Sequence, residues 1–312
     1  MRNKNETLEQ YVARLTESAI TRWRTGLLQI EDRKQRAMGL ALQNANRIPA
    51  PYTPYNDRDT PANNDLVLLA IESHDPGIYA IAVAQCLIVR VGENLEMAAG
   101  PCQGLSLEHW AQIDPDNAFP WLWIAARAAH AHNDIRTNEA LDRAAHASRL
   151  ASHLDEMVAL ALDALPPNVS PLEKAAAEGN LASIARLGSP FELLNLCSGQ
   201  ALASPVRKGQ CSSIAKLLAA EGSTINDVAL AEIFGHFLGW PEEQVAMLHR
   251  EYSSFSSYVR SRDDPWSNAD AGQRFECANL LRYNLFFDQL AAHRSGRAAM
   301  RAVIKLAGTP SP

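Results

Sequence analysis

The sequence has no long apolar run, no excess of positive charge and no closely spaced pair of cysteines. None of its apolar stretches approaches the roughly 18 residues of a membrane-spanning helix, so we expect no membrane span. The net charge is −6, and nucleic acid is not an expected partner because recognition of a phosphate backbone needs a basic surface. Hydrophobic residues make up 47% of the 312 positions and charged residues 21%, which is typical of a globular protein.

The absence of a Cys-x-x-Cys motif argues against a zinc ribbon and against thioredoxin-like redox chemistry. Four of the five cysteines nevertheless form two pairs, Cys86 with Cys102 and Cys197 with Cys211, and each pair brackets a turn signal. Cysteines equidistant from the turn of a helical hairpin can lie within disulfide reach. Cys277 has no evident mate.

The first ten residues, MRNKNETLEQ, are not followed by the apolar segment of a secretory signal. We therefore expect a cytoplasmic protein with reduced, buried thiols, because disulfides are rare in reducing compartments. The alternative is a periplasmic or secreted protein whose leader was removed. In that case Cys86–Cys102 and Cys197–Cys211 are expected to be disulfides, and thiol titration would distinguish the two.

Apolar residues recur at three- and four-residue steps through most of the chain, and no segment alternates apolar and polar residues as a strand does. The sequence therefore predicts an all-α fold. Residues 44–63 hold four prolines without periodicity and are the best candidate for a boundary or a binding loop. We expect N-terminal helices and this loop over 1–63, helical repeats over 64–165, and an irregular helical region over 166–312.

An internal repeat is visible in the middle of the chain, where an Asp-Pro pair at 75–76 recurs at 114–115. The second copy, IDPDNAFPWLWIAARAAHAHNDIRTNEALDRAAHA, resembles a tetratricopeptide repeat (TPR), although His132-Asn133 stands where that family has glycine. The matching residues are Ile113, Asp114, Pro115, Asn117, Ala118, Trp121, Ile124, Ala125, Asp134, Glu139, Ala140 and Ala147. This resemblance implies an α-solenoid of stacked antiparallel helical hairpins. The chain also resembles helical-repeat proteins of proteobacteria, which imply no activity.

Three motifs that imitate functional sites are better explained by structure. Asp114-Pro-Asp-Asn117 lacks the ligand count of a calcium loop and predicts a turn that caps a helix. His130 and His132 diverge by about 200° on a helix and cannot chelate one ion together. Residues 230–248 have helix-turn-helix rhythm, but the second helix opens with acidic residues that would face phosphate. We therefore expect no metal, no cofactor and no catalytic residues.

The two tryptophans of the repeat point to different surroundings. Trp121 is expected in the repeat core, whereas Trp123 covers a neighbouring helix, with core packing favoured, or lines a groove for a partner. Together with the repeat, these residues predict a non-enzymatic helical-repeat scaffold that binds a protein or peptide. The alternative is a helical protein with a small-molecule or catalytic pocket between its two halves.

Overall fold

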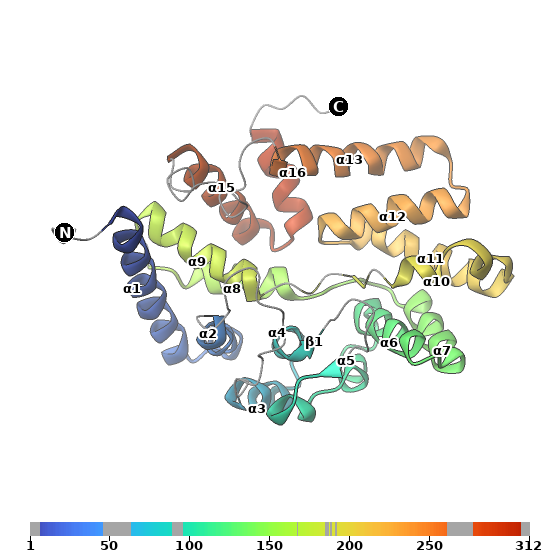
Figure 1. Cartoon of the computed structure of the whole chain (residues 1–312), viewed down its shortest axis with the longest axis horizontal. Helices are drawn as coiled ribbons and strands as arrows, with labels where there is room; N and C mark the ends of the chain where they lie inside the picture. The colour runs from blue at the N-terminus through green and yellow to red at the C-terminus, as the bar shows by residue number, and fades with distance from the viewer. Residues whose placement is uncertain are drawn as a thin grey trace. The chain divides into compact units, whose positions relative to one another are not determined.

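The structure, a computed structural model, describes residues 7–45, 64–88, 96–166, 168–184, 187, 189–190, 192–260 and 277–306. These residues are almost entirely α-helical (Figure 1), which confirms the predicted all-α class. Within these ranges no helix is long and apolar enough to cross a membrane. Residues 46–63 of the proline-rich segment 44–63 lie outside the described part of the chain. The expectation that this segment is a boundary or a binding loop therefore stays a prediction.

The chain forms two compact units that interleave in the sequence. The first unit contains Met1–Ile48, Asp155–Arg186 and Phe255–Ser311, and the second contains Pro49–Leu154 and Leu187–Ser254. The three consecutive segments expected from the sequence differ from this grouping. Helices distant in sequence share one core in the first unit, and a boundary search along the chain cannot detect such packing.

The first unit is built around helix α9, which packs against α1, α2 and α15. Its helices are α1 (Leu8–Gln29), α2 (Arg33–Ala45), most of α8 (Leu154–Asp163), α9 (Pro171–Ile184), α15 (Cys277–His293) and α16 (Gly296–Leu306). Helix α9 runs without a break through Gly179-Asn180. Asn180 donates from its side chain to the Ala176 carbonyl (2.9 Å), and Leu181 and Ile184 continue the buried face of α9.

Helices α1 and α2 form a hairpin. Helix α1 ends because Ile30 adopts extended backbone, and Asp32 accepts a hydrogen bond from the Gln35 N–H to start α2. Gly39 of α2 lies directly against Leu27 of α1. A side chain at position 39 would therefore separate the two helices.

Replacement of Gly39 with alanine is expected to lower the free energy of unfolding by about 1–3 kcal/mol, the usual cost of overpacking. A Cβ at this position would stand 2.9 Å from the Leu27 Cβ and 3.1 Å from the Leu28 nitrogen. Gly26→Ala in α1 is the matched control, because nothing lies within 4 Å of its added Cβ. Alanine is the better helix former, so this control should gain about 0.5–1 kcal/mol. Urea unfolding of both variants measures the opposite signs.

The second unit consists of short helices with one small sheet. Its elements are α3 (Asn64–Ser73), α4 (Pro76–Cys86), β1 (Leu87–Ile88), β2 (Glu96–Met97), the 3₁₀ turn η2 (Gly100–Gly104), α5 (Leu107–Ile113), α6 (Ala118–His130), α7 (Asp134–His146), α10 (Leu193–Leu196), η3 (Gly199–Ala203), α11 (Pro205–Glu221), α12 (Ile225–Leu238) and the first part of α13 (Glu242–Arg260). Helix α6 packs on α7, α11 packs on α12, and α7 packs on α11.

The segment that resembles a TPR forms the hairpin of α6 and α7. Asn117 caps α6 by accepting from the Phe119 N–H, and Asn133 caps α7 by accepting from the Arg136 N–H. The earlier copy is interrupted, because β1 pairs antiparallel with β2, with Leu87 opposite Met97. The expectation that the chain contains no strand was therefore wrong at this point. Leu87 and Ile88 open a run of large and β-branched side chains, which favours extended backbone over a longer α4.

Candidate functional site

Two disulfides brace the second unit, at the two pairs singled out in the sequence. Cys86 at the end of α4 is joined to Cys102 in η2, and Cys197 after α10 is joined to Cys211 in α11, with Cα–Cα distances of 5.5 and 5.6 Å. All four residues are buried. The expectation of reduced thiols was therefore wrong. It rested on the compartment inferred from the N-terminus, whereas the spacing about each turn correctly indicated the partners.

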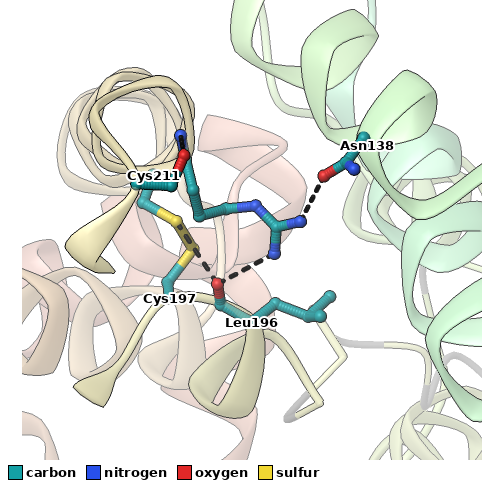
Figure 2. The surroundings of a disulfide bond; sticks show 6 residues. Asn138, Leu196, Cys197 and Cys211 are labelled. Atoms are coloured by element: carbon teal, nitrogen blue, oxygen red, sulfur yellow. Dashed lines mark hydrogen bonds between the residues drawn. A yellow bond between two sulfur atoms is a disulfide. The ribbon is translucent and has the colours of Figure 1, made fainter. Parts of the chain in front are cut away.

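A polar cluster surrounds the second disulfide (Figure 2). The Leu196 carbonyl accepts a hydrogen bond from the Arg207 guanidinium (3.2 Å) and lies 3.8 Å from the Cys211 sulfur, which has no hydrogen to donate in the disulfide. The same guanidinium donates to the Asn138 side-chain oxygen on α7, and Gln210 donates to the Asn138 carbonyl. Burial lowers the pKa of Arg207 from its ordinary value, although the Asp134 carboxylate opposes this shift. The cluster fixes α11 to both the α10 segment and α7.

Two large aliphatic side chains beside this cluster face the solvent. Ile135, in the first turn of α7, is 76% exposed, and Val206, in the first turn of α11, is 70% exposed. Val206 precedes Arg207 directly, and Ile135 lies one helical turn before Asn138. The surface formed by Ile135, Asn138, Val206 and Arg207 is called the α7–α11 face below. On this face exposed apolar side chains stand on two helices, α7 and α11, that hydrogen bonds join, and the Cys197–Cys211 disulfide ties α11 to the α10 segment.

The two repeat tryptophans differ in burial, and Trp121 is the more exposed of the pair. Trp123 is only 4% exposed, so it packs in the core and does not line an open partner groove. Trp121 is half-buried instead, with the Arg143 guanidinium 6.0 Å from its ring centre. Residues two apart on a helix point about 200° from each other, so only one of the pair can face the core. The TPR resemblance had assigned that role to Trp121.

The Asp-Pro-Asp-Asn motif is a buried brace. Asp114 accepts hydrogen bonds from the Asn117 amide (2.7 Å) and the Arg149 guanidinium, and lies 2.8 Å from His153 Nε2. The Asn117 side chain also bonds both backbone groups of Ala151. Burial by itself raises the pKa of Asp114. The hydrogen bonds from His153 and Asn117 and the charges of His153 and Arg149 outweigh this effect, so the pKa lies below its ordinary value. The predicted turn is confirmed, and it ties α6 to the segment after α7.

The histidines of the same hairpin do not form a metal site. His130 lies 3.4 Å from Glu192, and His132 stands in the turn with a positive φ of 52°. Across the described ranges, no three metal-ligating side chains gather into a group that could hold an ion.

A buried carboxyl lies inside the first unit, on α9. Glu178 is fully buried, and neither of its carboxyl oxygens has a hydrogen-bond partner among the described residues. The Lys174 amine is 4.0 Å away and also pairs with Asp288. Burial raises the pKa of Glu178 to about 8, with Lys174 lowering it and Asp288 raising it. The carboxyl therefore holds a proton at neutral pH, and charging it costs folding free energy.

A third polar group stands on the α12–α13 hairpin and was not singled out in the sequence. His249 Nδ1 lies 2.8 Å from Glu232 Oε1, and His249 Nε2 lies 3.3 Å from the Ser253 hydroxyl. The i, i+4 spacing of His249 and Ser253 is a readable signal, since such residues share a helix face. Glu232 lies seven residues before the turn at Gly239 and His249 ten residues after it, so spacing alone did not identify this pair.

Reduction of the disulfides is expected to destabilise the second unit. Each disulfide closes a loop of about 15 residues, for which loop-closure entropy accounts for about 3 kcal/mol. Cys197→Ser/Cys211→Ser should therefore lower the free energy of unfolding by about that amount. Urea unfolding of this variant and of the oxidised protein measures the difference. Adding reductant should destabilise the oxidised protein at least as much, and an unchanged midpoint in reductant would contradict the brace.

Comparison with known proteins identifies no relative: no family model, no curated protein and no solved structure matches the chain. The TPR resemblance thus stays a prediction based on the residues of the α6–α7 hairpin.

Proposed function

We propose that this chain is a helical-repeat scaffold of stacked hairpins that binds a protein partner on the α7–α11 face. The observation that carries the proposal is the exposure of two aliphatic side chains, Ile135 at 76% and Val206 at 70%. They stand in the first turns of α7 and α11, which the Arg207–Asn138 hydrogen bond joins. Full burial of a valine or isoleucine side chain is worth about 1.5–3 kcal/mol, and neither Ile135 nor Val206 is buried within this chain.

The surroundings of the two side chains support a protein partner. Asp134, Arg136 and Arg207 place both signs of charge and several hydrogen-bond donors beside the apolar groups, as in the polar rim of a protein interface. The Cys197–Cys211 disulfide and the Arg207–Asn138 hydrogen bond hold helices α7 and α11 in place before a partner binds. A partner therefore meets an ordered surface and pays little conformational entropy for it.

The test is capture of interacting proteins from cells that naturally express the chain, with three versions of the full protein as bait. Wild type and Leu306→Asp, a control that changes an exposed aliphatic residue of the first unit, should retain the same protein. Ile135→Asp/Val206→Asp should lose it by at least tenfold, because two anchors are replaced by charge. Equal recovery with all three baits, or no protein retained by wild type, would contradict the proposal.

The disulfides also favour work in an oxidising compartment, which was the alternative left open by the sequence. Thiol titration of the denatured protein isolated from its own cells should give one reactive thiol, that of Cys277, since the other four cysteines are paired. Five reactive thiols would place the protein in a reducing compartment.

A further inference from the structure

The α12–α13 hairpin brings a serine, a histidine and a glutamate into a linear hydrogen-bonded chain. Helices α12 and α13 lie side by side (Figure 1), and the contact between Glu232 and His249 joins them. His249 lies between the other two residues and uses a different ring nitrogen for each. Nucleophilic catalysis by serine requires this order of groups: a hydroxyl, a base, and a third group that orients the base.

The chemistry of the three side chains determines which ring nitrogen of His249 carries the hydrogen. An ionised Glu232 carboxylate can only accept a hydrogen bond, so His249 Nδ1 carries the hydrogen at their 2.8 Å contact. In a neutral imidazole the opposite nitrogen is then unprotonated, and Nε2 accepts the hydroxyl hydrogen of Ser253. Glu232 thereby selects the tautomer in which His249 can act as a base toward Ser253.

Two glycines shape the α12–α13 hairpin that carries these three side chains. Gly239 takes a left-handed conformation with φ of 71° at the turn, and it ends α12. A Cβ at Gly235 would stand 2.9 Å from the Trp240 ring and 3.1 Å from Val245, so the absence of a side chain allows close contact. Glu232 is mostly buried on α12, and its carboxylate lies 2.8 Å from His249 Nδ1.

We propose that Ser253 is a nucleophile for acyl transfer from activated esters, with His249 as general base and Glu232 as a positioning residue. This activity lies on different helices from the α7–α11 face and goes beyond the scaffold role. The His249 ring is 63% exposed, so an acyl donor can approach it from solvent. An aryl ester or a thioester fits this open site, because its leaving group departs with little assistance.

The reaction balances with the groups present. The Ser253 oxygen bonds to the carbonyl carbon while its proton passes to His249 Nε2, and a tetrahedral adduct forms. The carbon–oxygen or carbon–sulfur bond to the leaving group then breaks, and the leaving group takes the proton from the imidazolium. The products are acyl-Ser253 and the free alcohol or thiol, and water attacking the acyl-serine with the same base restores the hydroxyl.

The test treats the full chain with 4-nitrophenyl acetate and maps the acetylated residues by mass spectrometry. We expect acetylation of Ser253 and not of Ser254, its neighbour on α13. His249→Gln should slow acetylation of Ser253 by about 100-fold, the lower end of general-base catalysis. Ser254→Ala is the matched control and should react like wild type. Equal labelling of the two serines, or a rate unaffected by His249→Gln, would overturn the proposal.

Two further measurements separate chemistry from structure. Glu232→Gln should lower the rate of acetylation, and Glu232→Asp should restore part of it, since only a carboxylate selects the required tautomer of His249. A loss equal in both variants would instead assign Glu232 a packing role. An alkyl fluorophosphonate, which loses fluoride to an activated serine, should label wild-type protein at Ser253, so the result does not depend on any variant folding. Absence of this adduct would contradict the proposal.

Discussion

Replacement of Asp114 with alanine is expected to lower the free energy of unfolding by about 3 kcal/mol. Its buried carboxylate joins the Asn117 amide, the Arg149 guanidinium and the His153 ring. Arg149 is half-exposed and can return to water, so the cost arises mainly from His153 and Asn117, which stay buried without this partner. Breaking a buried pair from one side costs about 3–5 kcal/mol, and we take the lower end for that reason.

The measurement is urea unfolding of the full chain followed by tryptophan fluorescence. Asp142→Ala is the matched control, because Asp142 faces solvent beside the exposed His146 and should change stability by less than about 0.5 kcal/mol. The pKa of Asp114 is lowered in the folded state, so its contribution is present above about pH 4 and is lost as the pH falls through the folded pKa. Equal loss in the two variants at pH 7 would contradict the brace.

Replacement of Glu178 with glutamine is expected to stabilise the protein at neutral and alkaline pH. The pKa of Glu178 is raised from 4.5 to about 8, so the unfolded chain releases its proton earlier than the folded chain. Stability is therefore fully present below about pH 4.5 and falls as the pH rises toward 8. Glutamine is never charged, and the gain should reach about 3 kcal/mol at pH 7 and roughly 4 kcal/mol above pH 8.

Urea unfolding at pH 5, 7 and 9 measures this gain. Near pH 5 the variant and wild type should differ by less than about 1 kcal/mol, since this pH is only slightly above 4.5, the ordinary pKa at which Glu178 of the unfolded chain loses its proton. Glu17→Gln, an exposed change of the same charge in the first unit, should show no such growth with pH. A gain that is constant between pH 5 and pH 9 would mean that Glu178 is paired and charged in the folded protein.

The local features of the fold were readable from sequence because local chemistry determines them. Asn117 was predicted to cap a helix, and its side chain accepts the expected hydrogen bond from the Phe119 N–H. The cysteine pairs were likewise found from their position about a turn. In each of these cases the decisive partner lies within about 16 residues along the chain, so spacing alone carries the information.

The features that were missed depend on contacts between distant segments. The sequence spacing does not link Asn138 to Arg207, or Asp114 to His153. Whether these side chains meet in space depends on the turns and helices that lie between them in the sequence. The expectation that Trp121 fills the core failed for the same reason: the helix period shows that Trp121 and Trp123 face apart, but only the neighbouring helices decide which one is buried. The burial of Glu178 was also hidden, since its helix reads as an ordinary capped segment.

The central claim is that the α7–α11 face contacts a protein, and site-specific photo-crosslinking tests it most directly. A photoreactive amino acid replaces Ile135 in one version of the full chain and Leu306 in another, and both are activated in cells that naturally express the protein. We predict one crosslinked protein at position 135 that is absent at position 306 and is lost when Val206→Asp is added. The same crosslinks at both positions, or a crosslink at position 135 that survives Val206→Asp, would contradict the account.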